Sequence, residues 1–241
     1  MGAGGTNRSA EPKYCGLYLD PGENMGMGEK LVEWEYDDHP RARTVADYCL
    51  LLIDRLTENY PAMLDILKDV RPPHASMFAE VVPQGREYLA GNYRGAPYPQ
   101  LIDRPVFIYG FDCAHYSEVH KLMDSFHHEL VEGMEKIGVL ARAGGWTPAQ
   151  SLVALSAFVS HIFVNFLKIH PFANGNGHIS RLLVWCIFQY KRIKCKFWQI
   201  PDRNVNPPDY MIGRYRNGDM NPLINCFLYL IRAENSNVAL D

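Results

Sequence analysis

The sequence has no long uninterrupted apolar run and no excess of positive charge. Its most apolar stretch, residues 151–169, is broken by five polar residues, namely Ser156, Ser160, His161, Asn165 and Lys168. We therefore expect no transmembrane segment. The formal net charge is -3, which argues against the basic surface that nucleic-acid binding proteins carry. From these two features we expect neither a membrane-spanning protein nor a nucleic-acid partner.

Closely paired cysteines and a secretory signal are also missing. None of the six cysteines forms a C-x-x-C pair, and the chain does not open on a basic region followed by an apolar one. A disulfide framework and secretion are therefore not expected, which favours a reducing, cytoplasmic location. The opening letters MGAGGT fit the spacing of N-myristoylation at Gly2, but a flexible or non-native leader would look the same.

What the chain does contain is helical periodicity. Apolar residues recur at helical spacing between residues 44 and 70, where Pro61 separates two helices and the pair Pro72–Pro73 ends the second. Residues 83–105 are dense in glycine and proline and predict loops, and residues 104–110 predict a short strand or hairpin arm. The composition, 47% hydrophobic over 241 residues, suits a packed globular core.

The second half predicts the helices of the core. Residues 117–137 form one amphipathic helix with Ser117 as its N-cap, and Thr147–Pro148 caps a helix over residues 149–168 that is apolar nearly all round. Further helices are predicted at residues 182–190 and 223–232. The fold class is therefore mainly α, with one short β-element.

The loop IHPFANGNGHISRLL, residues 169–183, joins two of these buried helices. Pro171 disfavours helical backbone at His170 and so ends the first helix. Gly175 and Gly177 permit positive φ, and a helix that starts at about His178 directs unpaired N–H groups to the same point. From the residues alone, this loop is an anion site with Arg181 as a second hold, or a glycine-rich turn without chemistry.

The motif HPFANGNGHISR resembles the signature of the Fic (filamentation induced by cAMP) domain family, His-Pro-Phe-x-(Asp/Glu)-Gly-Asn-Gly-Arg-x-x-Arg. GNYR at residues 91–94, VFIYG at residues 106–110 and SEVHKLMDSF at residues 117–126 are similar to the family's flap and following helix. The resemblance covers roughly residues 85–200. It implies a Fic-type helical bundle with a short β-hairpin flap beside the active-site loop. Residues 85–241 would form that domain with a C-terminal helical extension, after a lead-in (residues 1–30) and a helical annex (residues 31–84).

The resemblance implies a protein adenylyltransferase that moves AMP from ATP, with Mg²⁺, to a Ser, Thr or Tyr hydroxyl of a target protein. His170 would be the general base, and Phe172 would anchor the loop in the core. The phosphate cradle would comprise Asn174, Gly175, Asn176, Gly177, His178 and Arg181. The target-docking flap would comprise Tyr93, Arg94, Val106, Phe107 and Ile108.

Two residues of the motif depart from the family pattern, and both change the charge. Asn174 stands where the family has the acidic Mg²⁺ ligand, and His178 stands where the family has its first arginine. An amide oxygen is a weaker Mg²⁺ ligand than a carboxylate, and imidazole lacks the donor fork of arginine. A degenerate domain that binds nucleotide or peptide without turnover stays open, and so does transfer of UMP, a phosphoryl group or phosphocholine.

Regulation by the family's inhibitory helix, with its Ser/Thr-x-x-x-Glu-(Gly/Asn) motif, is not predicted for this chain. Only fragments occur, such as Ser76-x-x-x-Glu80 followed by valine. The restraint is therefore absent or supplied by a separate inhibitory chain. The sequence also leaves open a homodimer.

Overall fold

The computed structural model describes Trp34 and residues 39–98, 100–102, 105–108, 110–143, 145–195, 207 and 209–235, with the side chains of the last helix described through residue 231. The predicted lead-in, residues 1–30, lies outside the described residues. Within the described part, the helices are α1 Ala42–Leu56, α2 Tyr60–Lys68, α3 Arg71–Phe78, α4 Val119–Arg142, α5 Pro148–Ile169, α6 Asn176–Tyr190, α7 Asp209–Arg216 and α8 Asn221–Asn235. The strands β1 Phe107–Ile108 and β2 Phe111–Asp112 form one antiparallel hairpin. The predicted mainly α fold with a short hairpin is confirmed.

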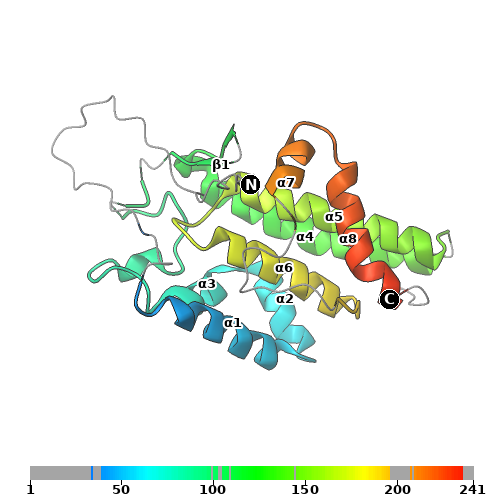
Figure 1. Ribbon diagram of the computed structural model, residues 1–241, viewed down its shortest axis with the longest axis horizontal. Coiled ribbons are helices and arrows are strands. Elements are labelled where there is room, and N and C mark those ends of the chain that lie inside the picture. The colour runs from blue at the N-terminus through cyan, green and yellow to red at the C-terminus, as the bar shows by residue number, and fades with distance from the viewer. Residues whose placement is uncertain are drawn as a thin grey trace, which may run out of the picture.

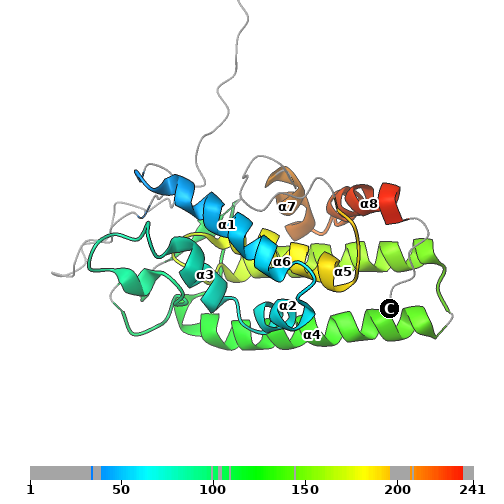
Figure 2. The same ribbon diagram turned by 90° about the horizontal axis from the view of Figure 1, so that it is seen from below.

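Helix α5 is the central element of the bundle. It packs against α4, α6, α7 and α8, and α4 and α5 run side by side in both views (Figures 1 and 2). By length and mean hydropathy, 1.8, α5 is the one described helix that could cross a membrane, yet 61% of its apolar window is buried inside the protein. Buried Ser156 and Ser160 each donate a hydrogen bond of 2.8 Å to the carbonyl four residues earlier. The helix is therefore apolar because it forms the core.

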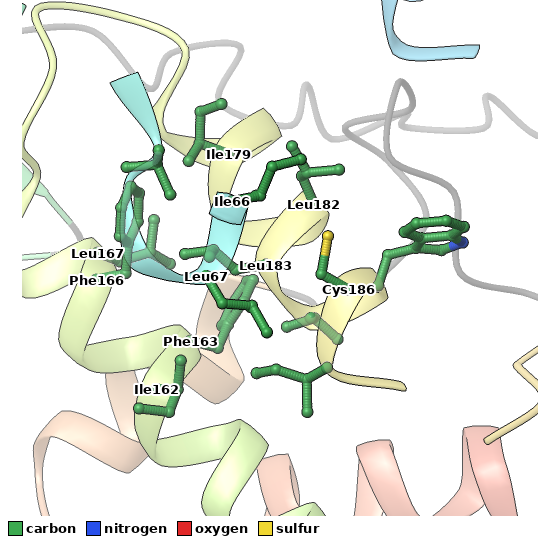
Figure 3. Packing of buried hydrophobic residues seen from close by; sticks show 14 of the residues in the cluster. Ile66, Leu67, Ile162, Phe163, Phe166, Leu167, Ile179, Leu182, Leu183 and Cys186 are labelled. Atoms are coloured by element: carbon green, nitrogen blue, oxygen red, sulfur yellow. The ribbon is translucent and has the colours of Figure 1, made fainter. Parts of the chain in front are cut away.

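The core lies where α2, α5 and α6 meet. Figure 3 shows side chains of the three helices in contact, among them Leu67 of α2, Phe166 of α5 and Leu183 of α6. All three are at most 1% exposed. Burial of an aliphatic or aromatic side chain of this size stabilises a fold by about 1.5–3 kcal/mol. The loop between α5 and α6 is therefore held at both ends by the best-packed part of the molecule.

Several predicted helix boundaries are confirmed by cap geometry. Thr147 and Gln150 form a capping box at the start of α5, with Pro148 as the first helical residue. Pro61 lies in the first turn of α2, where the side chain of Asn59 accepts from the N–H of Ala62. The sequence therefore located these helix starts correctly, because each is decided by local hydrogen bonding.

Two boundary predictions are wrong. The pair Pro72–Pro73 does not terminate a helix; it lies in the first turn of α3, where a missing N–H costs nothing because the first N–H groups of a helix have no intrahelical acceptor. Ser117 is not the N-cap of α4, since it lies in a 3₁₀ turn, Tyr116–Glu118, that precedes the helix. Helix α7 was not predicted at all.

Gly133 and Gly213 offer a matched test of the packing between α4 and α5. A Cβ on Gly133 would lie 2.3 Å from a ring carbon of Phe158, whereas a Cβ on Gly213 of α7 would meet nothing within 4 Å. Gly133→Ala forces the ring of Phe158 to move, so it should be less favourable than Gly213→Ala by about 1 kcal/mol or more. Gly213→Ala should raise the free energy of unfolding by about 0.5–1 kcal/mol through helix propensity.

Urea denaturation of both variants measures the two effects. Because the substitution is the same in each, equal effects of the two variants would show that the contact with Phe158 does not restrict position 133.

Candidate functional site

The end of α5 is fixed by Arg94, whose side chain is fully buried. Its Nε donates to the carbonyl of His170 and its Nη2 to the carbonyls of Ile169 and Ala114, all at 2.8 Å. The backbone N–H of Arg94 donates to the carbonyl of Pro171 at 2.7 Å. The last carbonyls of a helix have no intrahelical donor and carry the negative end of its dipole. A buried cation at this place therefore satisfies both the carbonyls and its own charge.

His170 leaves the helix in a left-handed conformation, with φ 50° and ψ 61°. Such a conformation is uncommon and strained for a residue with a side chain. Its own N–H still donates to Phe166 at 2.8 Å, and its carbonyl is held by Arg94. The predicted general base is thus rigidly placed at the first turn of the loop, where its side chain is half-buried.

The middle of the loop is closed by Asn176. Its Oδ1 accepts from the N–H of Phe172 at 2.9 Å and its Nδ2 donates to the carbonyl of the same residue at 2.8 Å. Asn176 is 2% exposed, and both ends of its side-chain amide are engaged within the loop, so the side chain supports the loop structure. Phe172 is fully buried, as the resemblance implied.

Helix α6 begins two residues earlier than predicted, at Asn176, with Gly175 as its N-cap at φ 77°. A Cβ on Gly175 would lie 2.4 Å from Phe78 and 3.1 Å from Nε2 of His74, both on α3. The glycine is therefore required by its conformation and by the close approach of α3. Six residues, His170 to Gly175, connect the end of α5 to the start of α6.

Arg181 and His178, the two remaining residues of the predicted cradle, differ in their surroundings. The guanidinium of Arg181 lies over the first turn of α6, since a Cβ on Gly177 would be 3.3 Å from its Nη1. His178 is buried, and its ring makes a T-shaped contact with Phe78, with 5.8 Å between centroids. The arginine is therefore placed at the positive end of α6, while the histidine packs on an aromatic ring.

Asn174 is engaged at both ends of its side-chain amide. Its Oδ1 accepts from the N–H of Gly175 at 2.7 Å, and its Nδ2 donates to the carbonyl of Trp34, a buried residue. In the described part of the chain no three His, Cys, Asp or Glu side chains gather as metal ligands. These residues do not fit a resident Mg²⁺, because the one predicted ligand is neutral and already hydrogen-bonded.

The predicted target-docking flap divides into two places. Tyr93 and Arg94 lie in the interior, 4% and 0% exposed, and cannot reach a target in this structure. Val106 is buried, Ile108 is half-buried, and Phe107 on β1 is 49% exposed. The prediction assigned all five to one surface because sequence adjacency does not reveal that residues 93–94 run beneath the α5–α6 loop.

Arg216 of α7 positions the hairpin and was not predicted. Its Nη2 donates to the carbonyl of Asp112 at 2.9 Å, and its guanidinium lies 4.2 Å from the ring centroid of Phe111. Such a cation–π contact contributes about 0.5–2 kcal/mol. The hairpin is therefore tied to the C-terminal helices as well as to the loop. Nothing in the local sequence signals this contact, because about 100 residues separate its partners.

His74 is a second residue that sequence reasoning missed. It lies on α3, is fully buried and connects two loops, with Nε2 3.0 Å from the carbonyl of Asn174 and Nδ1 accepting from the N–H of Gly91 at 2.9 Å. Its ring stacks on Phe172 with centroids 3.7 Å apart and planes 9° apart. Burial lowers the pKa of His74 to about 3, so the ring is neutral at physiological pH.

A comparison with protein-family models matches the central part of the chain. The model of the Fic/DOC family matches residues 67–188, which is half of the chain. The matched range includes α3 with His74, the hairpin and the whole α5–α6 loop. No curated protein matches the chain.

Gly175→Ala tests how tightly the loop is packed. The substitution combines positive φ with a clash against Phe78, so the free energy of unfolding should fall by about 3 kcal/mol. Gly85→Ala is the control, because Gly85 has φ 76° but open space around its Cβ, and should cost only about 1–2 kcal/mol. Chemical denaturation compares the two. Equal losses would mean that strain alone, and not the contact with α3, makes Gly175 necessary.

The buried His74 predicts a dependence of stability on pH. Its pKa is about 3 in the folded chain against an ordinary 6.5, so below pH 6.5 the unfolded chain binds a proton that the folded chain does not. The contribution of the neutral His74 to stability is therefore fully present above pH 6.5, and it is lost as the pH is lowered toward 3. Between pH 7.5 and pH 5 the loss from this group should be about 2 kcal/mol.

Denaturation at the two pH values measures that loss. In His74→Gln the difference should be smaller by about 2 kcal/mol, since the glutamine does not titrate. An unchanged difference would show that His74 is accessible to protons in the folded protein.

Proposed function

Because the chain belongs to the Fic/DOC family, whose members are transferases, we propose that it transfers AMP from ATP to a hydroxyl group of a Ser, Thr or Tyr side chain in a target protein. The observation that carries the proposal is the placement of His170 and the N-terminus of α6 at the two ends of one rigid six-residue loop. A base and an anion site are thereby held at a fixed separation. Such positioning is the main requirement of phosphoryl-type chemistry.

The base in the proposed reaction is the imidazole of His170. It takes the proton of the target hydroxyl as the hydroxyl oxygen attacks the α-phosphorus of ATP. The new bond joins this oxygen to phosphorus, the bond from the α-phosphorus to the bridging oxygen breaks, and pyrophosphate leaves with both electrons of that bond. The proton on His170 then passes to water or to pyrophosphate. General-base catalysis of this kind contributes about 10²–10⁴-fold in rate.

Stabilisation of the negative charge is assigned to Arg181 and the first turn of α6. Arg181 is 8% exposed and close to Gly177, and a largely dehydrated guanidinium binds phosphate oxygens more strongly than an exposed one. The helix N-terminus adds unpaired N–H groups and the positive end of the dipole. The two together supply positive potential where the pyrophosphate charge develops.

Magnesium in this scheme arrives with the triphosphate, as MgATP, and would neutralise phosphate charge when bound. The described residues provide no carboxylate for it at Asn174. No step of the proposed mechanism therefore depends on a protein-bound metal ion.

A second candidate function is a domain that binds nucleotide without turnover. The observation that favours it is the engagement of Asn174 with Trp34 and Gly175 and of His178 with Phe78. The side-chain amide of Asn174 is hydrogen-bonded inside the protein, and the ring of His178 packs on an aromatic ring. They contribute packing in place of the two opposite charges that the motif normally provides.

The experiment that decides between the two candidates uses ATP labelled at the α-phosphate, with the protein alone and with cell extract. We expect label on the protein or on an extract protein, and at least a 100-fold lower rate with His170→Ala. ATP should raise the melting temperature of the wild-type protein and of His170→Ala by mass action. ATP labelled at the γ-phosphate is the control, because AMP transfer leaves that label in pyrophosphate.

The double variant Asn174→Asp, His178→Arg separates the failures. If the wild-type protein transfers nothing while this variant transfers AMP, the adenylyltransferase proposal is wrong and the degenerate domain is correct. Label from γ-labelled ATP, or an added mass equal to UMP or phosphocholine when a non-adenine donor of that group replaces ATP, would instead assign a different transferred group.

A further inference from the structure

His74 fixes the orientation of the peptide group between Asn174 and Gly175. Its Nδ1 accepts a hydrogen bond from the N–H of Gly91, and a backbone N–H can only donate. The proton of the neutral ring therefore resides on Nε2, which donates to the carbonyl of Asn174 at 3.0 Å. Because a peptide group is planar and trans, the N–H of Gly175 points the opposite way. In this structure that N–H donates a hydrogen bond to Oδ1 of Asn174.

The peptide group needs such a restraint because of the glycine that follows it. Glycine adopts positive and negative φ with similar ease, so an Asn–Gly peptide can rotate and exchange the directions of its carbonyl and N–H at little cost. A rotated peptide would direct the negative end of the carbonyl dipole to the side where phosphate is expected. Anion sites built from backbone depend on N–H groups that converge on the ligand.

The surroundings of His74 hold the ring in place. The ring lies between Phe172 and Phe78, with centroid distances of 3.7 Å and 4.7 Å. Gly91, at the other end of the ring, has φ 87°, and a Cβ there would lie 2.9 Å from Ala75 on α3. The ring is thus confined by stacking and by close backbone approach on both sides, and it can act as a rigid link.

We infer that His74 is a positioning residue for phosphate binding: its Nε2–H holds the carbonyl of Asn174 toward the interior, so that the N–H of Gly175 faces the phosphates of the nucleotide. When nucleotide binds, a phosphate oxygen takes the place of Oδ1 of Asn174 as the acceptor of this N–H. The inference rests on the nucleotide site of the proposed function. It requires binding of ATP, and it does not require turnover.

Two substitutions separate the hydrogen bond to Asn174 from the packing of the ring. His74→Gln places an amide nitrogen near the former Nε2 and keeps the donor to Asn174. His74→Asn places an amide oxygen near the former Nδ1 and keeps only the acceptor for Gly91. Each loses the stacking and one hydrogen bond, so the two should have similar melting temperatures. Met77→Ala, on the same helix and 1% exposed, is the control for destabilisation without loss of the link.

The measurement is the dissociation constant of MgATP by isothermal titration calorimetry, with adenosine as the ligand without phosphates. We expect His74→Asn to bind ATP at least ten-fold more weakly than the wild type, and His74→Gln and Met77→Ala to stay within about three-fold. Adenosine affinity should be the same in all four proteins. A purely structural role would weaken both ligands in proportion to the loss of stability.

Several outcomes would overturn the inference. They are equal ATP affinity of folded His74→Asn and wild type, a ten-fold loss in folded His74→Gln, and no binding of ATP by the wild type. If His74→Asn does not fold, the Gln variant and the Met77→Ala control still decide. A wild type that binds ATP but transfers nothing would refute the proposed function and leave the role of His74 intact.

Discussion

The hydrogen bonds of Arg94 to the end of α5 are the contact on which the site depends. Burying a guanidinium is costly unless its charge and its donors are satisfied. Here they meet the carbonyls of Ile169, His170 and Ala114 at 2.8 Å, where the dipole of a 22-residue helix ends. The same bonds hold His170 in its left-handed conformation. They also connect three segments of the chain, namely the GNYR segment, Ala114 after the hairpin, and the α5–α6 loop. Without this cation, the most apolar helix of the protein would end in unsatisfied carbonyls.

A second, uncharged set of contacts continues the support along the loop. Asn176 closes the loop on Phe172, and His74 connects Asn174 to Gly91. Because these groups are neutral, the positive potential on the α6 side of the loop comes from Arg181 and the start of α6. The charge of Arg94 lies on the other side of the loop, at the C-terminal end of α5. The division explains how one short loop can lie between two cations, one near each helix end.

Much of this arrangement was predictable from the sequence, and the reason is locality. The capping box at Thr147, the helix break at Pro61 and the core helix α5 are decided by residues within one or two turns. The site loop was found because its motif is contiguous. His74, Arg216 and the interior place of Arg94 were not found, since each acts on a carbonyl about 75–110 residues away in the chain. The hydrophobic periodicity of the sequence gives no information about such contacts.

The neutral residues at positions 174 and 178 have a consequence for the packing of the loop. A carboxylate at position 174 would face the carbonyl of Trp34, and an arginine at position 178 would bring a second charge against Phe78 and the core. An amide and an imidazole are accommodated there with a smaller desolvation cost. The loop is thereby preorganised, and under the proposed function the electrostatic stabilisation is concentrated on Arg181 and the backbone of α6. Preorganisation favours binding, whereas fewer charges lower the stabilisation of the transition state. Under the proposed function, the balance between these two effects decides whether the site transfers AMP or only binds nucleotide.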